Sequence, residues 1–71
     1  MSRPQKHSLT LSGHRTSVSL EPEFWLAFRE IAAQSGKGIN ALAAEIDASR
    51  GADTGLASAI RLHVLATLRA P

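Results

Sequence analysis

The alternation of apolar and polar positions in residues 15–20 predicts one short β-strand. Val18 and Leu20 occupy one side of the alternation, and three polar side chains occupy the other. A period of two is typical of a strand with one face on a core and the other in solvent. The polar side consists of Arg15, Ser17 and Ser19. We therefore expect these three side chains to point outward.

A second and weaker alternation precedes this strand, and its phase is different. Leu9 and Leu11 fall on odd positions, whereas the apolar residues after position 15 fall on even positions. A slip of one residue turns every side chain to the opposite face. Gly13 lies at the slip. The sequence therefore indicates a β-bulge or tight turn at this glycine, or a hairpin with Gly13-His14 as its two-residue turn.

Two amphipathic helices are expected next. Pro22 suits the first turn of a helix, where its missing N–H has no partner to lose. Apolar residues then recur at helical spacing as far as Gly36, which is a typical helix terminator. A second helix is expected over residues 39–50, with Asn40 as its N-cap.

A third helix is expected over about residues 55–69, with Asp53 or Thr54 as its cap. Its apolar residues spread around more than one face, which is typical of a helix buried on several sides. A chain of 71 residues buries little surface by itself. The pattern therefore favours a second copy of the chain as the cover for this helix.

Composition supports association and argues against other stabilisers. The chain has no cysteine, so disulfides and thiolate zinc sites are excluded. Its three histidines lie at positions 7, 14 and 63, without the i, i+4 spacing of a helical metal site. We expect no metal and no cofactor, and we expect a homodimer.

The charge is unevenly distributed. Residues 1–20 contain three basic and no acidic residues, whereas residues 21–71 contain five basic and six acidic ones. A basic N-terminal segment suggests an anionic partner. We interpret residues 1–7 as a flexible basic arm and residues 8–71 as one domain. The sequence lacks a signal-like or membrane-spanning apolar run, so a cytoplasmic location is expected.

Three stretches of the chain resemble a known family. The pattern "RTSVSLEPEFW" followed by "AAQSGKGINALAAEI" resembles the ribbon-helix-helix family of the MetJ/Arc type. With the trailing "LASAIRLHVL", the chain is similar to a bacterial subgroup that has an added C-terminal helix. The resemblance implies a mainly α fold, β-α-α-α, with one short strand per chain. It also implies an intertwined homodimer whose two strands form an antiparallel ribbon.

The resemblance implies which residues bind DNA, because the ribbon of this family enters the major groove. The expected base contacts are Arg15, Ser17 and Ser19. The expected phosphate contacts are the amides of Ile39 and Asn40 at a helix start, together with Lys37 and Lys6. The expected dimer core comprises Val18, Leu20, Phe24, Phe28 and Ile46.

The function expected from this resemblance is sequence-specific DNA binding by a homodimeric transcriptional regulator, most simply a repressor. The alternative is a protein-interaction or antitoxin-like dimerisation module that uses the apolar third helix. An enzyme is not expected, because the chain has no nucleophile motif or carboxylate pair and is too small for an enclosed pocket. The sequence leaves open whether residues 39–50 or 55–69 form the family's second helix.

Overall fold

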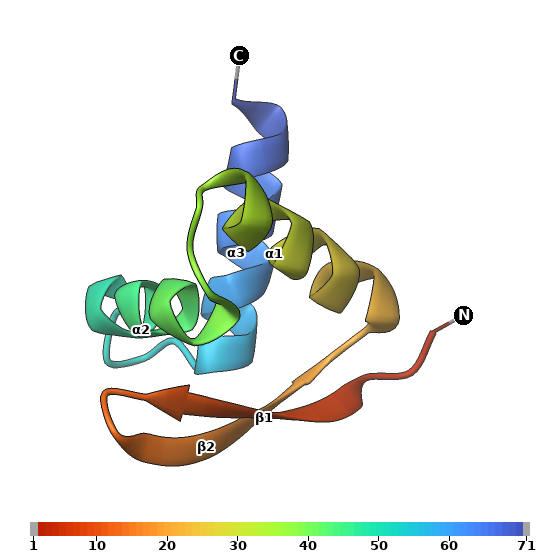
Figure 1. Ribbon diagram of the computed structural model, residues 1–71. Helices are drawn as coiled ribbons and strands as arrows, with labels where there is room; N and C mark the ends of the chain where they lie inside the picture. Colours follow the sequence, from red (N-terminus) through yellow and green to blue (C-terminus); the bar gives the residue numbers. More distant parts are fainter. Residues whose placement is uncertain (1, 71) are drawn as a thin grey trace.

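The computed structural model describes residues 2–70, which form a β-hairpin and three helices (Figure 1). The elements are β1 (Gln5–Leu11), β2 (His14–Leu20), α1 (Pro22–Gln34), α2 (Ile39–Ser49) and α3 (Leu56–Arg69). The hairpin lies at the bottom of Figure 1, and the three helices lie on one side of it. The helix α3 begins near the hairpin and runs away from it towards the C-terminus.

The prediction of one strand per chain is wrong, because β1 pairs with β2 of the same chain. The two strands are antiparallel, from Gln5 opposite Leu20 to Leu11 opposite His14. The strand β1 starts inside the segment that we expected to be a flexible arm, residues 1–7. The alternation that contains Leu9 and Leu11 covers too few residues to predict a strand by itself. The segment nevertheless forms β1, because β2 follows directly in the chain and pairs with it. Homodimerisation stays a prediction, but the hairpin already supplies both strands of a ribbon within one chain.

The change of phase near Gly13 is a hairpin turn and not a bulge. Ser12 and Gly13 are its two central residues, with φ values of 52° and 85°. Positive φ at both central positions is the conformation that matches the twist of the flanking strands. The turn lies one residue earlier than the Gly13-His14 turn that we considered. Because Leu11 and His14 face each other, odd positions of β1 and even positions of β2 share one face.

Both ends of α1 follow from the sequence. Pro22 is its first residue, and Gly36 ends it in the left-handed region with φ of 71°. The N–H of Lys37 donates to the carbonyl of Ala32 at 2.9 Å. This bond closes a Schellman motif, which needs a residue with positive φ at the position of Gly36.

The other two helices have the expected extents but different caps. Gly38 and not Asn40 is the N-cap of α2. Likewise, Gly55 is the N-cap of α3, in place of Asp53 or Thr54. Neither cap has a side-chain hydrogen bond. The Asn40 side chain does not cap α2 because its oxygen accepts a hydrogen bond from the hairpin.

One hydrophobic core joins the inner face of the hairpin to all three helices. Val18 is 4% exposed and Leu20 is fully buried, as the alternation predicts. The core consists of Leu9, Val18 and Leu20 from the hairpin, Phe28, Ile31 and Ala32 from α1, Leu42, Ala43 and Ile46 from α2, and Ala59, Ile60 and Val64 from α3. Burial of these side chains fixes which face of the hairpin remains outside.

Candidate nucleic-acid interface

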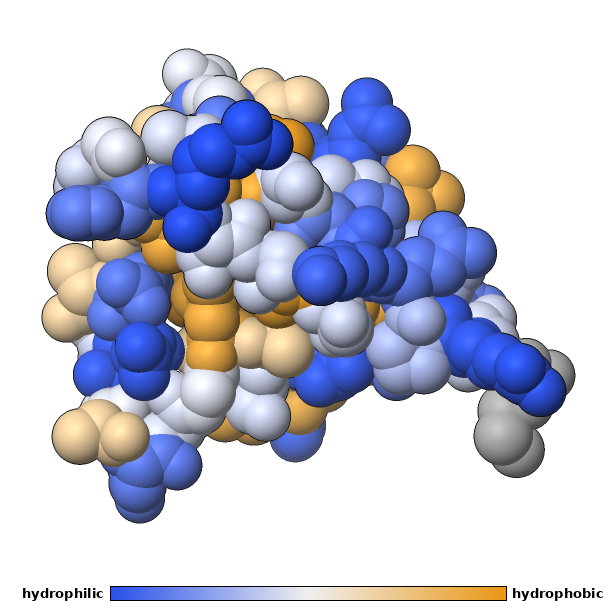
Figure 2. Space-filling view, turned by 90° about the horizontal axis from the view of Figure 1, so that it is seen from below, coloured by the Kyte–Doolittle hydropathy of each residue, from blue (hydrophilic) through white to orange (hydrophobic). Residues whose placement is uncertain are grey.

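The outer face of the hairpin carries only basic and hydroxyl side chains. They are Lys6, Ser8 and Thr10 from β1 and Arg15, Ser17 and Ser19 from β2, and all six are exposed. The first acidic residue of the chain is Glu21, after the hairpin. Figure 2 views the molecule from below, the side on which the hairpin lies. Most of this surface is hydrophilic or intermediate (blue to white), with hydrophobic residues (orange) between. We call the six exposed side chains of Lys6, Ser8, Thr10, Arg15, Ser17 and Ser19 the outer face.

The register places the two cations at diagonal corners of the outer face. Lys6 lies opposite Ser19 at the open end of the hairpin, and Arg15 lies opposite Thr10 beside the turn. Four residue steps along a strand separate these pairs by roughly 14 Å. The four hydroxyls fill the area between the two charges. The outer face thus offers two positive charges and four hydroxyls that donate or accept hydrogen bonds at short range. This combination suits a polyanion that also exposes hydrogen-bonding groups.

The main chain of β1 is attached to α2 near the turn. The N–H of Thr10 donates to Oδ1 of Asn40 at 3.0 Å. The Asn40 side chain therefore binds the hairpin, and only its main-chain amide is available for the expected phosphate contact. The first bond within α2 is made by the N–H of Leu42 to the carbonyl of Gly38. The amides of Ile39 and Asn40 precede it, as the first amides of a helix do.

Lys37, another expected phosphate ligand, lies close to the start of α2. Its Nζ is 2.7 Å from Oε1 of Glu45, and both side chains are well exposed. An exposed pair of this kind contributes little to stability, so the ammonium can exchange its partner at small cost. The side chain of Ile39 is half-buried against the core and contributes no polar group.

A second attachment holds the opposite end of the hairpin. Nε and Nη2 of Arg61 on α3 both lie 2.9 Å from Oε1 of Glu21, which follows β2. Nη2 also donates to the carbonyl of Ser19 at 3.4 Å. The pKa of Glu21 is lowered, chiefly by the hydrogen bond from its own backbone N–H and next by Arg61. Sequence reasoning missed this contact because its partners are 40 residues apart.

The inner face of the hairpin has an aromatic contact at its open end. The rings of His7 and Trp25 stack with centroids 3.8 Å apart and an interplanar angle of 5°. Nε2 of His7 is buried without a hydrogen-bond partner among the described residues. Trp25 in turn contacts Phe28 in the core. This stack joins β1 to α1, and neither ring reaches the outer face.

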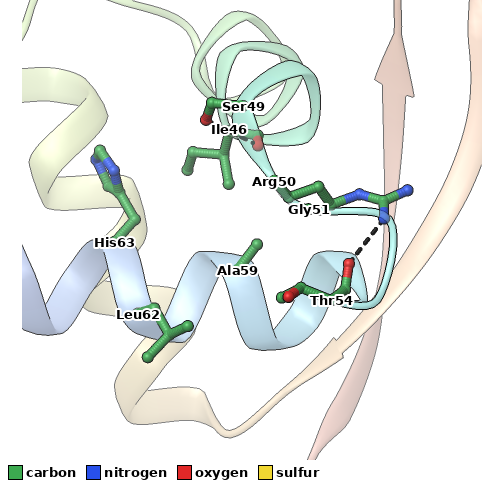
Figure 3. A pocket seen from close by; sticks show the side chains of 8 residues that line it. All are labelled: Ile46, Ser49, Arg50, Gly51, Thr54, Ala59, Leu62 and His63. Carbon is green, nitrogen blue, oxygen red and sulfur yellow. Dashed lines mark hydrogen bonds between the residues drawn. The ribbon is translucent and has the colours of Figure 1, made fainter.

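A shallow hollow of about 310 Å³ lies between the end of α2 and α3 (Figure 3). Its most polar wall is Arg50, whose Nε donates to Asp47 and whose Nη1 donates to the carbonyl of Thr54. The hydroxyl of Ser49 donates to the carbonyl of Ile46. In Figure 3 the ring of His63 lies on the far side of the hollow from the Arg50 guanidinium. Arg50 thus links the end of α2 to the loop before α3, and the polar groups around the hollow do not converge on one point.

The residues expected in a dimer core lie in the core of the single chain. Phe28 is fully buried and Ile46 is 5% exposed. Val18 and Leu20 are buried with them, and Phe24 packs half-buried against the same cluster. These five side chains therefore pack within one chain, and dimerisation itself stays a prediction.

Apolar surface is exposed mainly on the side of α3 opposite the core. Leu62, Leu65 and Leu68 are 59%, 48% and 70% exposed, and they follow one another at intervals of three residues. Leu26 on α1 is also exposed. We call the three leucines of α3 the leucine strip. The leucine strip runs from the middle of α3 to its C-terminal end, and that end of the helix points away from the hairpin (Figure 1).

Comparison with known proteins identifies the family. Within residues 2–70, no helix is long and apolar enough to cross a membrane. No curated protein and no solved structure matches the chain significantly. The sequence profile of the ribbon-helix-helix domain matches residues 4–68, a range that includes both candidates for the second helix and does not choose between them. The chain therefore belongs to the ribbon-helix-helix domain family, whose members are generally DNA-binding transcription regulators or antitoxins and not typically enzymes.

Proposed function

We propose that the protein is a sequence-specific DNA-binding transcriptional regulator that represses by occupying an operator. The observation that carries this proposal is the outer face, a two-stranded surface with two cations, four hydroxyls and no acid. The major groove of B-DNA is about 12 Å wide and admits a two-stranded β-ribbon. In this proposal the ribbon is the hairpin of one chain, and not one strand from each of two chains.

In this proposal four of the six side chains of the outer face contact DNA. Arg15 reads a base edge, because a guanidinium can donate two hydrogen bonds to guanine O6 and N7. Ser17 and Ser19 make shorter contacts to bases, and Lys6 holds a phosphate beside Ser19. The amides of Ile39 and Asn40, assisted by Lys37, hold a second phosphate at the start of α2.

The proposal includes a homodimer, since the family dimerises. Pairing of two chains through β2 would place four strands side by side. Neighbouring strands are about 4.8 Å apart, so the outer strands would be roughly 14 Å apart and too wide for the groove. We therefore propose that the second copy covers the leucine strip, which is exposed along the C-terminal half of α3. This arrangement leaves each outer face open to DNA.

The DNA proposal is tested by selecting bound duplexes from a random pool and titrating the selected site by mobility shift. Arg15→Ala is expected to weaken binding by about 1–3 kcal/mol and to relax specificity at one base pair. Arg29→Ala, which removes an exposed cation from α1, is the matched control and should leave affinity nearly unchanged. Failure to recover any motif, or equal losses in the two variants, would contradict the proposal.

The dimer proposal is tested by light scattering on two variants. Leu65→Glu places a charge in the leucine strip and should yield a folded monomer. Ser17→Pro should leave the dimer intact, because the N–H of residue 17 points to the outer edge of β2 and not to β1. The reverse result would show that the chains meet through their strands.

A second candidate function is an antitoxin-like interaction module, and the leucine strip favours it. An exposed apolar surface of this kind is a common site for another protein. This reading requires that the purified chain stays monomeric, selects no DNA motif and binds a different protein in a way that Leu65→Glu abolishes. A dimer that binds a defined site would exclude it as the main function.

A further inference from the structure

Two polar contacts attach the hairpin to the helices at opposite corners. Asn40 of α2 accepts a hydrogen bond from Thr10, which lies on β1 beside the turn. Arg61 of α3 donates to the carbonyl of Ser19, which lies on β2 at the open end. The two strands are therefore held at different edges and at different ends. A sheet fixed at two diagonal corners cannot tilt about either strand without breaking one of these bonds.

Of the two residues that attach the hairpin, Arg61 makes more contacts than Asn40. Its guanidinium meets Glu21 through both Nε and Nη2, and it lies 5.8 Å from the centroid of the Phe24 ring. The side chains of Arg61 and Glu21 are only 30% and 27% exposed. Glu21 is also the residue that joins β2 to α1 without a loop. The ion pair therefore acts at the joint that sets the angle between hairpin and helices.

We propose that Arg61 is a positioning residue for the outer face and that it acts through Glu21 and the Ser19 carbonyl. This inference rests on the proposed DNA-binding function and adds a residue that does not touch DNA itself. The positive charge of Arg61 is already neutralised by Glu21, so little of it remains for a phosphate. Arg61 instead fixes where Ser19, and Lys6 opposite it, stand relative to α3 and the start of α1.

The positioning role of Arg61 and simple electrostatics predict opposite changes in DNA affinity when the charge of Glu21 is removed. Removal of an acidic charge close to DNA should strengthen binding if only charge matters. Glu21→Gln should instead weaken binding to the selected site by about five-fold, the scale of a partly exposed ion pair. Glu23→Gln is the matched control, since Glu23 is a neighbouring acid that contacts the Ser2 hydroxyl and not Arg61. Its affinity should equal or exceed that of the wild type.

Arg61 variants separate positioning from direct phosphate contact. Arg61→Gln should weaken specific binding while the slope of log affinity against log salt stays that of the wild type. Loss of a true phosphate contact would reduce that slope by about one. Arg61→Lys should recover part of the affinity, because it keeps the ion pair but cannot also reach Ser19 with a planar fork. The double variant with Glu21→Gln should be no weaker than the weaker single variant.

All variants are first compared by thermal melting, so that only folded proteins are titrated. If Glu21→Gln binds as well as or better than the wild type, or if Arg61→Gln reduces the salt slope, the inference is overturned while the proposed function stands. If the wild-type protein binds no DNA, both are overturned, because no interface remains to be positioned. If Arg61→Gln does not fold, the sign of the effect of Glu21→Gln decides alone.

Discussion

The two faces of the hairpin are built from the same fourteen strand residues, yet they obey different constraints. The inner face contains Leu9, Val18 and Leu20, which are almost completely buried against three helices. The outer face contains hydroxyls and two cations whose side chains support no part of the core. Alternation thus separates stability from binding along a single strand. Substitutions at neighbouring positions of β2 should therefore affect different properties: folding stability on the inner face and DNA binding on the outer face.

The largest effect is expected from Val18→Asp. Val18 is 4% exposed within the core, so an ionised carboxylate there would have no partner and little water. An uncompensated buried charge costs several kcal/mol, which is comparable to the whole stability of a small domain. We expect no cooperative thermal transition by circular dichroism.

The adjacent substitution Ser17→Asp is the control for this prediction. Ser17 is exposed on the outer face, so the variant should fold with a melting temperature close to that of the wild type. Its negative charge should nevertheless repel DNA and abolish the mobility shift. Similar melting curves for the two variants would break the comparison between the faces.

Gly13→Ala tests the turn that decides which residues share a face. Gly13 has φ of 85° with open space around its Cα, so an added methyl group meets no atom and only the backbone conformation is penalised. The expected loss is about 1–2 kcal/mol in the free energy of unfolding. Gly38→Ala, at a glycine with negative φ and equally open space, should lose less, because the lower entropy of the unfolded chain offsets part of the N-cap loss. Urea denaturation distinguishes the two, and equal losses would refute the assigned turn.

The acid dependence of stability tests the Glu21 carboxylate at the end of β2, whose charged form is stabilised by its own backbone N–H and next by Arg61. The pKa of Glu21 is lower in the folded chain than its ordinary value of 4.5. The folded state therefore binds this proton less readily, and the stabilisation is complete above about pH 4.5 and is lost as the pH falls below it. The difference in melting temperature between wild type and Glu21→Gln should shrink between pH 7 and pH 3. A constant difference would argue that the carboxylate charge is not what stabilises this corner.

The smallest effect is expected from Ser12→Asn. Ser12 has φ of 52°, a conformation that asparagine adopts more readily than serine. Asn-Gly is the preferred pair for a turn with positive φ at both central residues. We expect a gain of a few tenths of a kcal/mol and no change in DNA affinity. A lower urea midpoint for the variant would show that the side chain of Ser12 has a role beyond the turn.

Local patterns were enough to predict the helices and the parity of β2. Pro22 and Gly36 set the ends of α1 through backbone restrictions that hold in any context. The alternation of β2 gave the buried positions Val18 and Leu20. The family was also recognisable from these elements, since their order and spacing follow from short-range rules.

What the sequence did not reveal depends on pairs of distant residues. The side chain of Asn40 was expected at a helix cap, but it binds Thr10, which lies 30 positions earlier. No local pattern singles out Arg61 on α3, because its partner Glu21 lies 40 positions earlier. The hairpin was only one of the alternatives at Gly13, and its turn was placed one residue too late, because serine is not the usual first residue of such a turn and Ser12-Gly13 is therefore a weak signal.

The stack of His7 on Trp25 gives the molecule an internal optical reporter. Trp25 is the sole indole of the chain, and its neighbour across the ring belongs to β1. Detachment of the hairpin would bring water to one face of the indole and shift its emission to longer wavelength, even while the helices stay folded. Fluorescence of the unlabelled protein therefore follows the docking of the ribbon separately from the melting of the rest.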